Sequence, residues 1–507
     1  MVSTLTKDKR LLTLRLAGLG RLGEALAEAE GKQVFVFGGI PGEKVVAEVI
    51  RERRGYVAAQ VVEVLEPSPH RRQAPCRYFG ACTGCQWQHV TYEHQLEMKR
   101  DIVVDALERV GGLDFPEVRE TLPSPDEFNY RNHARFTVSQ EPRSVREDEP
   151  PPPPPGLLGY VHRELRRMVP VDECMIMAPW INEAVSALQG KVGETTQLSL
   201  RHGVNTGDWM LQPTFKSAEV PMASGQKHYQ ESLLGHTFQV SSPSFFQVNT
   251  HQAERMARLV IDELALTGRE TVVDAYAGVA TFAVLIAPHV RRVLAVEESA
   301  SALDDAKVNT EGIANVELRK AKTEDVLREM ASDGVDAVIL DPPRAGCMPG
   351  TLEALLEVPP VRIVYVSCDP ESLARDLRVL TDGPFRIDSV QPVDMFPQTH
   401  HVECVTVLSL DPERQAALEA RRHLVLASAS PRRREALADL SLAFDIQPTD
   451  VPEPPHDASQ GDGLAVAQAR ALAKAQAAAA EADAGTVVGA DTVVELDGAV
   501  LGKPADA

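Results

Sequence analysis

The residues with the clearest chemical potential lie in the segment VRIVYVSCDPESLARDL, residues 361–377. The apolar, β-branched run Ile363–Val366 is typical of a strand that is buried on both faces. Cys368 follows the run almost directly, and the leucine spacing after Pro370 predicts a helix. Because ligands of open α/β sheets bind outside the carboxyl ends of the strands, Cys368 is a candidate nucleophile. A small thiol used only for packing is the alternative that this stretch leaves open.

Other apolar runs also meet polar residues at their ends. TVVDA contains Asp274 before a glycine-bearing turn, VLAVE ends at Glu297, and DAVILD ends at Asp341. A last run, CVTVLSL, begins just after Glu403. If that strand is antiparallel in a mixed sheet, its start lies at the edge where the parallel strands end, so Glu403 would face Cys368. The strand and helix alternation from residue 241 predicts a Rossmann-like α/β domain.

Four cysteines form a candidate metal site. Cys76, Cys82 and Cys85 have the spacing C-x5-C-x2-C, and Cys174 is a distant fourth sulfur. Such a set suits a [4Fe–4S] cluster or, less well, a structural zinc ion. Unligated thiols around a tight turn are the alternative. The seven cysteines show no pairing scheme, which favours a reducing compartment.

Residues 10–66 contain short strand-like runs separated by glycine turns, which predicts a small OB-like β-barrel. The stretch FVFGGIPGEKVVAEV resembles the TRAM module of RNA-modifying enzymes, although another five-stranded barrel would give the same periodicity. Residues 1–75 hold 12 Lys and Arg against 9 Asp and Glu, about +3 in total. The clusters at residues 51–54 and 70–72 are candidate phosphate contacts.

Composition limits the remaining possibilities. A chain of 507 residues predicts three or four domains. The net charge of −21 argues against broad, non-specific affinity for nucleic acid. No apolar run is long enough for a membrane span, and the N-terminus lacks a secretory signal. We therefore expect a cytoplasmic protein with no membrane association, and we infer no obligate protein partner.

These signals predict a multidomain α/β protein. We expect an OB-like RNA-binding barrel at 1–70, an iron–sulfur cysteine loop at 71–98, a central β-rich domain at 99–240, a Rossmann-like α/β domain at 241–410, a linker at 411–422 and a partial α/β tail at 423–507. The acidic and then proline-only stretch at 147–155 is expected to be an exposed spacer at a hairpin tip.

Six ordered motifs resemble one family, the RNA 5-methyluridine methyltransferases that use S-adenosylmethionine, and among them the 23S rRNA type with a TRAM domain and an iron–sulfur cluster (the RlmD/RumA type). The motifs are SFFQVN, DAYAGVATF, AVEES, DPPRAG, YVSCDPESLARDL and MFPQTHHVECV. The resemblance implies Cys368 as the nucleophile that adds to uracil C6 and Glu403 as the base that removes the C5 proton. The resemblance also implies six cofactor ligands: Gln247, Asp274, Tyr276, Gly278, Glu297 and Asp341. The ligands of the cluster would be Cys76, Cys82, Cys85 and Cys174.

The chain departs from this family pattern at three positions. Thr83 stands where the family usually has Gly, Ala277 where it has Cys, and Ala280 where it has Gly. An alanine at 280 predicts a negative φ at that turn.

The tail carries a second resemblance, to the Maf family of nucleotide pyrophosphatases, in HLVLASASPRRREAL and GADTVVELDGAVLGKP. The resemblance implies phosphate-site candidates at Ser430, Arg432, Arg433, Asp491 and Lys503. The tail spans roughly half of that family's length, so we expect it to be inactive alone.

Three functions remain open. The leading hypothesis is a methyltransferase that acts on 23S rRNA, with tRNA as the alternative substrate. A hydrolase of nucleoside triphosphates acting through the tail is the second. A non-catalytic RNA-binding or assembly factor is the third, and the presence of both Cys368 and Glu403 argues against it.

Overall fold

A computed structural model of the chain describes residues 10–113, 117–140, 154–162, 168–422, 424–439, 444–449, 451, 463–481, 486–496 and 499–501. Two compact units are present. Residues 1–382 with 386–410 form the first, and residues 383–385 with 411–507 form the second. Each unit is described by itself. Of the stretch predicted as a spacer, residues 147–155, residues 147–153 lie outside the described residues.

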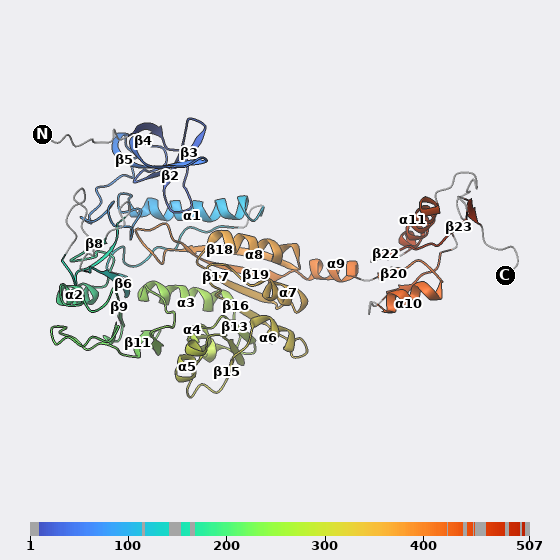
Figure 1. Cartoon of the computed structure of the whole chain (residues 1–507). Helices are drawn as coiled ribbons and strands as arrows, with labels where there is room; N and C mark the ends of the chain where they lie inside the picture. Colours follow the sequence, from blue (N-terminus) through green and yellow to red (C-terminus); the bar gives the residue numbers. More distant parts are fainter. Residues whose placement is uncertain are drawn as a thin grey trace. The chain divides into compact units, whose positions relative to one another are not determined.

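A five-stranded sheet begins the first unit (Figure 1). Its strand order is β1-β4-β5-β3-β2, and only the pair β3–β5 is parallel. Its edges also meet, because the Ala17 N–H donates to the Leu26 carbonyl and the Leu26 N–H to the Gly18 carbonyl. The inward positions of β3 and β5 alternate with exposed ones, as the sequence periodicity predicts. The strands are β1 (Leu11–Arg15), β2 (Ala25–Ala29), β3 (Lys32–Phe37), β4 (Lys44–Glu52) and β5 (Tyr56–Glu66).

Helix α1 (Tyr92–Arg109) follows and packs against helix α8 (Pro370–Asp382). The buried face of its early turns includes the polar residues Gln95 and Lys99. A second five-stranded sheet, in the order β10-β9-β6-β7-β8, and the hairpin β11–β12 come next. Their elements are β6 (His133–Val138), β7 (Leu158–Val161), β8 (Met168–Pro170), α2 (Pro179–Leu188), β9 (Gln197–His202), β10 (Trp209–Gln212), β11 (His228–Leu233) and β12 (His236–Ser241).

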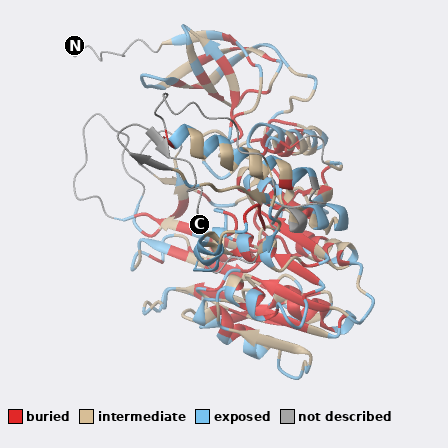
Figure 2. Ribbon diagram, turned by 90° about the vertical axis from the view of Figure 1, so that its right-hand side faces the viewer, coloured by how far each residue is buried: buried red, intermediate tan, exposed pale blue. Residues whose placement is uncertain are grey.

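The large sheet has seven strands in the order β15-β14-β13-β16-β17-β19-β18, and Figure 2 shows its central strands as buried. Strands β13 to β17 are parallel, and β19 is antiparallel to β17, as predicted for the last strand. The order reverses between β13 and β16, the point where ligands bind in such folds. The strands are β13 (Thr271–Ala275), β14 (Arg292–Val296), β15 (Val316–Arg319), β16 (Ala337–Leu340), β17 (Arg362–Ser367), β18 (Phe385–Val393) and β19 (Glu403–Leu410).

Helices connect these strands and supply the rest of the core. Buried residues of α3 and α4 join those of β13, β14 and β16 in one apolar cluster. The helices are α3 (Thr250–Leu264), α4 (Thr281–Ile286) with the short 3₁₀ turn η1 (Ala287–His289), α5 (Ala300–Asn309), α6 (Thr323–Glu329), α7 (Pro349–Glu357) and α8 (Pro370–Asp382).

The second unit contains a three-stranded parallel sheet, β21-β20-β22, and the antiparallel hairpin β23–β24. The segment predicted as a linker is helical over most of its length. The elements are α9 (Pro412–Arg422), β20 (Leu424–Leu426), α10 (Pro431–Asp439), β21 (Phe444–Ile446), α11 (Gly463–Glu481), β22 (Thr486–Val488), β23 (Val494–Leu496) and β24 (Ala499–Leu501). Over the described residues of both units, no helix is long and apolar enough to cross a membrane.

Candidate active site

Cys368 and Glu403 lie at the same end of two adjacent strands. In the antiparallel ladder of β17 and β19, Ser367 pairs with Cys404. Cys368 follows Ser367 directly at the end of β17, and Glu403 precedes Cys404 at the start of β19. Both side chains line a cavity of about 510 Å³. The ladder thus brings a thiol and a carboxyl group, the residue types of covalent and acid–base catalysis, to one cavity.

Both groups favour their protonated forms in this setting. Burial, with smaller contributions from Glu403 and Asp341, raises the pKa of Cys368 to about 12, and Arg344 acts in the opposite direction. Burial and Asp341 also raise the pKa of Glu403 to about 8, while Arg344 and Lys99 lower it. A thiol with so high a pKa is a poor nucleophile at neutral pH. The thiol form of Cys368 is therefore favoured at neutral pH, and additional positive charge nearby would favour the thiolate.

Three carboxyl groups surround the turn after β13. Asp274 is fully buried on β13, and one of its oxygens accepts the Ala283 N–H at 2.8 Å at the start of α4. Its other oxygen, Oδ1, has no hydrogen-bond partner among the described residues. Glu297, just after β14, accepts the Gly278 N–H at 2.9 Å. Burial raises the pKa of Asp274 to about 8 and that of Asp341 to about 7, so this edge suits a cationic ligand that carries hydroxyl groups.

The turn itself has an unusual backbone. Tyr276, Gly278 and Ala280 all have positive φ, at 60°, 57° and 66°. The expectation of a negative φ at Ala280 is therefore wrong. Ala280 is the N-cap of α4 and has to adopt the left-handed conformation to direct the chain from β13 into that helix. The Tyr276 hydroxyl lies 3.0 Å from the Thr351 hydroxyl, which anchors the turn to α7.

Gln247, the remaining predicted cofactor ligand, lies between β12 and α3. Its backbone carbonyl accepts the side-chain amide of Asn132 at 3.1 Å, which ties the segment to the second five-stranded sheet. The preceding Phe245 is 69% exposed and lines the same cavity as Cys368.

The four predicted metal-ligating cysteines come together. Cys76, Cys82, Cys85 and Cys174 line the cavity that holds Cys368 and Glu403. The Gly84 N–H points at Cys82 Sγ at 3.4 Å, and no disulfide joins any of the seven cysteines, all of which are described. Burial raises the pKa of Cys174 to about 11 and, with the other three thiols, that of Cys85 further. Within the described residues, however, no three Cys, His or acidic side chains converge closely enough to hold a single metal ion.

Sequence reasoning missed several residues around the cavity. Phe396, Arg131, Arg135 and Arg344 all line it. The two adjacent phenylalanines of SFFQVN could have predicted an exposed aromatic side chain, because neighbouring residues of an extended chain face opposite sides. In the structure Phe246 is buried and Phe245 is exposed. The cavity is therefore lined by aromatic and cationic groups, which suit bases and phosphates.

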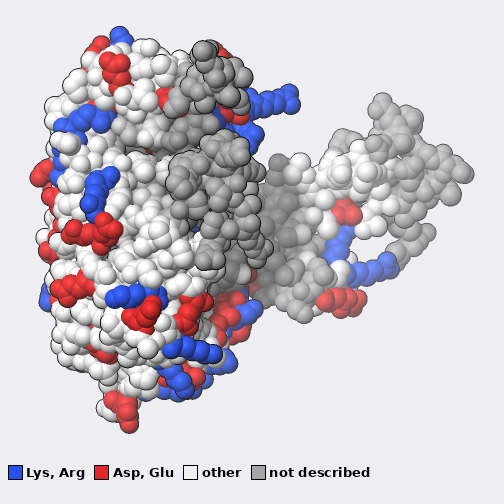
Figure 3. All heavy atoms as spheres, turned by 60° about the vertical axis from the view of Figure 1, so that its left-hand side comes forward, with Lys and Arg blue, Asp and Glu red and all other residues white. Residues whose placement is uncertain are grey.

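Two residues of one basic cluster predicted to contact phosphate form ion pairs within the protein. Arg71 donates from Nε and Nη2 to the fully buried Glu43 at 2.6 Å, and Arg72 reaches Glu127 at 3.3 Å. A buried carboxylate needs such a partner, so Arg71 is committed to the fold. On the face shown in Figure 3, acidic and basic side chains are interspersed.

In the second unit, part of the predicted phosphate site comes together. Arg433 donates to Ser428 Oγ at 2.9 Å and to Asp491 at 3.2 Å, and Lys474 also pairs with Asp491. These cations lower the pKa of Asp491 despite its burial, and the Thr492 N–H acts with them. Ser430 and Arg432 flank the start of α10, with Arg432 exposed. Lys503 lies outside the described residues.

Comparison with known families covers both units. Residues 232–410 match the family model of tRNA (Uracil-5-)-methyltransferase, and residues 423–507 match that of Maf-like proteins. An uncharacterized RNA methyltransferase of Listeria monocytogenes is 35% identical over 456 residues, which are 79% of this chain and 96% of that protein. One from Gloeobacter violaceus is 32% identical over 451 residues, 78% of this chain and 96% of that protein.

A solved structure shows the same architecture. The Pyrococcus abyssi tRNA (uracil-54, C5)-methyltransferase, in complex with S-adenosyl-L-homocysteine, superposes with a TM-score of 0.59 at 26% identity. The match covers 78% of this chain and 99% of that one.

Proposed function

The chain belongs to the RNA uracil-5-methyltransferase family, and from this premise we propose that it forms 5-methyluridine with Cys368 as nucleophile and Glu403 as base. One observation carries the proposal. The two residues adjoin the last pair of the β17–β19 ladder, and both side chains line one cavity.

The reaction needs both groups. Uracil C5 is a weak nucleophile, so the Cys368 thiolate first adds to C6, and the C5=C6 π electrons move toward C5 and O4. S-adenosylmethionine is the co-substrate and supplies an electrophilic methyl group, which C5 accepts as the methyl–sulfonium bond breaks. Glu403 then takes the C5 proton. The C5–H electrons restore the double bond, and the C6–sulfur bond breaks to release the thiolate.

The cofactor roles follow the edge of the sheet. We assign to S-adenosylmethionine the carboxyl groups of Asp274, Glu297 and Asp341 together with Tyr276 and Gly278 of the turn, and Gln247 from the segment before α3. The unpartnered, buried Oδ1 of Asp274 and the acidic character of the edge support this assignment, because the co-substrate carries a positive sulfonium and ribose hydroxyls. Glu297 is the acid suited to the ribose.

The RNA partner is most consistent with 23S rRNA, with tRNA as the alternative. The proposed TRAM-type barrel and cysteine loop favour rRNA, whereas the solved Pyrococcus structure is of a tRNA enzyme. The target base must leave its stack to reach Cys368, and the exposed Phe245 at the cavity gives an extruded or neighbouring base a surface to stack on.

We further propose that Cys76, Cys82, Cys85 and Cys174 hold a [4Fe–4S] cluster that stabilises this side of the cavity. In such a cluster each thiolate binds its own iron, so the four sulfurs need not converge on one point. Their common cavity and the N–H of Gly84 directed at Cys82 support the assignment. Anaerobically purified protein should contain about four irons per chain. Cys82→Ser should lose them and Cys404→Ser, buried elsewhere, should not.

The decisive experiment is transfer of labelled methyl groups from S-adenosylmethionine to unmodified 23S rRNA and tRNA. We expect the label as 5-methyluridine in 23S rRNA and no transfer by Cys368→Ala. Label found only in tRNA would identify tRNA as the substrate and leave the proposed reaction unchanged. If iron-loaded protein labels neither RNA, the proposal is wrong.

A second activity is suggested by the match of residues 423–507 to Maf-like proteins and by the Ser428, Arg433 and Asp491 group. A serine and an arginine at the start of a helix suit phosphate. Release of pyrophosphate from nucleoside triphosphates by the full chain, abolished in Arg433→Gln, would establish this activity. Intact nucleotides after prolonged incubation would exclude it.

A further inference from the structure

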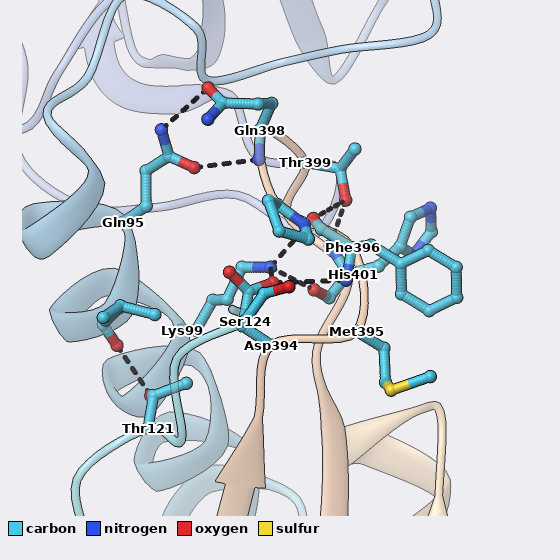
Figure 4. Close-up of polar contacts among 12 residues, drawn as sticks. Gln95, Lys99, Thr121, Ser124, Asp394, Met395, Phe396, Gln398, Thr399 and His401 are labelled. Carbon is cyan, nitrogen blue, oxygen red and sulfur yellow. Dashed lines mark hydrogen bonds and ion pairs between the residues drawn. The ribbon is translucent and has the colours of Figure 1, made fainter. Parts of the chain in front are cut away.

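The segment between β18 and β19, residues 394–402, leads directly into Glu403. One face of α1 binds this segment through side chains spaced three and four residues apart, Tyr92, Gln95 and Lys99. Figure 4 shows Gln95 and Lys99 directed at the segment. The helix belongs to a distant part of the sequence, so the position of the proposed base depends on residues outside the large sheet.

Lys99 makes the central contacts. Its side chain and that of Asp394 are both fully buried, and Lys99 Nζ donates to Asp394 Oδ1 at 2.5 Å. The same Nζ donates to the carbonyl of Phe396 at 3.1 Å and to that of His401 at 2.7 Å. Lys99 thereby joins the beginning of the segment to its end, two residues before Glu403.

These contacts require the charged form of Lys99. A protonated lysine has three N–H donors, and all three are used here, whereas a neutral amine has only two. Burial lowers the pKa of Lys99, and Asp394 and Glu403 counteract that shift. Two further hydrogen bonds hold the Asp394 carboxyl group in position beside the cation. It accepts the Tyr92 hydroxyl at 2.9 Å and the Phe396 N–H at 3.2 Å.

Gln95 makes a neutral attachment one turn earlier in α1. Its amide donates to Gln398 Oε1 at 3.0 Å and accepts the Gln398 N–H at 3.0 Å (Figure 4). The segment is therefore attached to the helix by a charged residue, Lys99, and separately by a neutral one, Gln95. This difference separates an electrostatic role from a purely structural one.

The charge of Lys99 acts on Glu403. The ionisable groups that interact with Glu403 are the acids and thiols Asp341, Cys368 and Cys404 and the cations Arg344 and Lys99. Arg344 is 65% exposed at its side chain and is screened by water, whereas Lys99 is fully buried. For stability alone, an apolar pair of similar volume would serve as well as the Lys99–Asp394 ion pair.

We propose that Lys99 is a positioning residue for proton removal, which holds the Glu403 segment in place and supplies the buried positive charge that favours the Glu403 carboxylate. This inference rests on the proposed role of Glu403 as the base. Without the cation, Glu403 stays protonated to higher pH and the methylated Cys368–RNA complex persists longer.

The test measures how fast the methylated covalent Cys368–RNA complex resolves, in single turnovers across pH 6 to 9.5. The variant Lys99→Met/Asp394→Asn removes both charges and so leaves no unpaired buried ion. We expect its resolution to slow about tenfold at pH 7 and to approach the wild-type rate at high pH. Gln95→Met, which weakens the neutral attachment, should lower the rate evenly without moving the pH profile.

Several outcomes would decide against the inference. A wild-type pH profile in the double variant would show that Lys99 has only a structural role. The same shift of the profile in Gln95→Met would show this as well. If the double variant does not fold by circular dichroism, Lys99→Gln/Asp394→Asn keeps an amide donor and tests the same expectation. Glu403→Gln is measured alongside. If that variant also resolves normally, the proposed base itself is wrong and not only its regulation by Lys99.

Discussion

Glu403 begins β19 beside the Ser367–Cys404 pair of the ladder, and its side chain lines the same cavity as that of Cys368, the residue after Ser367. Glu403 raises the pKa of Cys368, because its carboxylate opposes a negative thiolate. In the proposed reaction the two groups act in sequence, the thiolate in the first covalent step and the carboxylate in the removal of the C5 proton.

Glu403→Gln should therefore stop the reaction after methyl transfer. An amide keeps the shape of the side chain but cannot take the C5 proton, so turnover should fall by about 10²–10⁴-fold. The methylated RNA should remain attached to Cys368 and migrate with the protein on denaturing gels. Cys368→Ala is the control that forms no such complex. Free 5-methyluridine-containing RNA at the wild-type rate would contradict the role of Glu403.

The nucleophile should be activated by the charge of the co-substrate. Burial, Glu403 and Asp341 raise the pKa of Cys368 to about 12, and a sulfonium bound near these carboxylates would lower it. We expect S-adenosylmethionine to accelerate alkylation of Cys368 by iodoacetamide several-fold relative to S-adenosylhomocysteine, which is nearly isosteric but lacks the sulfonium charge. Peptide mapping identifies the labelled cysteine. Equal rates with the two ligands would show that Cys368 is activated by another route.

The sequence predicted that most of the candidate site residues lie at one edge of the sheet because of one regularity. Ligands bind where parallel strands end, and Asp274, Glu297, Asp341 and Cys368 all lie at such ends. Because β19 is antiparallel to β17, it starts at the edge where β17 ends, and Glu403 lies at that start.

Lys99 was not predicted as a residue near the site, because its helix begins YEHQLEMKR, which has the composition of an exposed surface. Its burial depends on Asp394, 295 residues later, and such long-range pairing leaves no local signal. The ion pair of Arg71 left no local signal for the same reason, since its partner Glu43 lies on a different segment.

Ala280→Gly should stabilise the protein slightly. Ala280 has a φ of 66°, and the left-handed conformation costs a residue with a Cβ about 1 kcal/mol. The greater freedom of glycine in the unfolded chain offsets roughly half of that gain. We expect the free energy of unfolding to rise by about 0.5 kcal/mol in urea titrations. A clear loss of stability would mean that the buried methyl group contributes more through packing than the backbone strain costs.

Asp274→Asn should separate stability from cofactor binding. Burial raises the pKa of Asp274 to about 8, whereas an unfolded aspartate loses its proton near pH 4. Between these values the folded protein holds a proton that the unfolded chain releases, so its free energy of unfolding falls as pH rises. The amide accepts the Ala283 N–H but never ionises, and should raise stability at pH 8 by about 2 kcal/mol.

Affinity of the same variant for S-adenosylmethionine, measured by calorimetry, should fall, because the buried carboxylate that faces the cofactor edge is lost. An unchanged affinity would remove Asp274 from the proposed cofactor ligands and leave it a cap for α4.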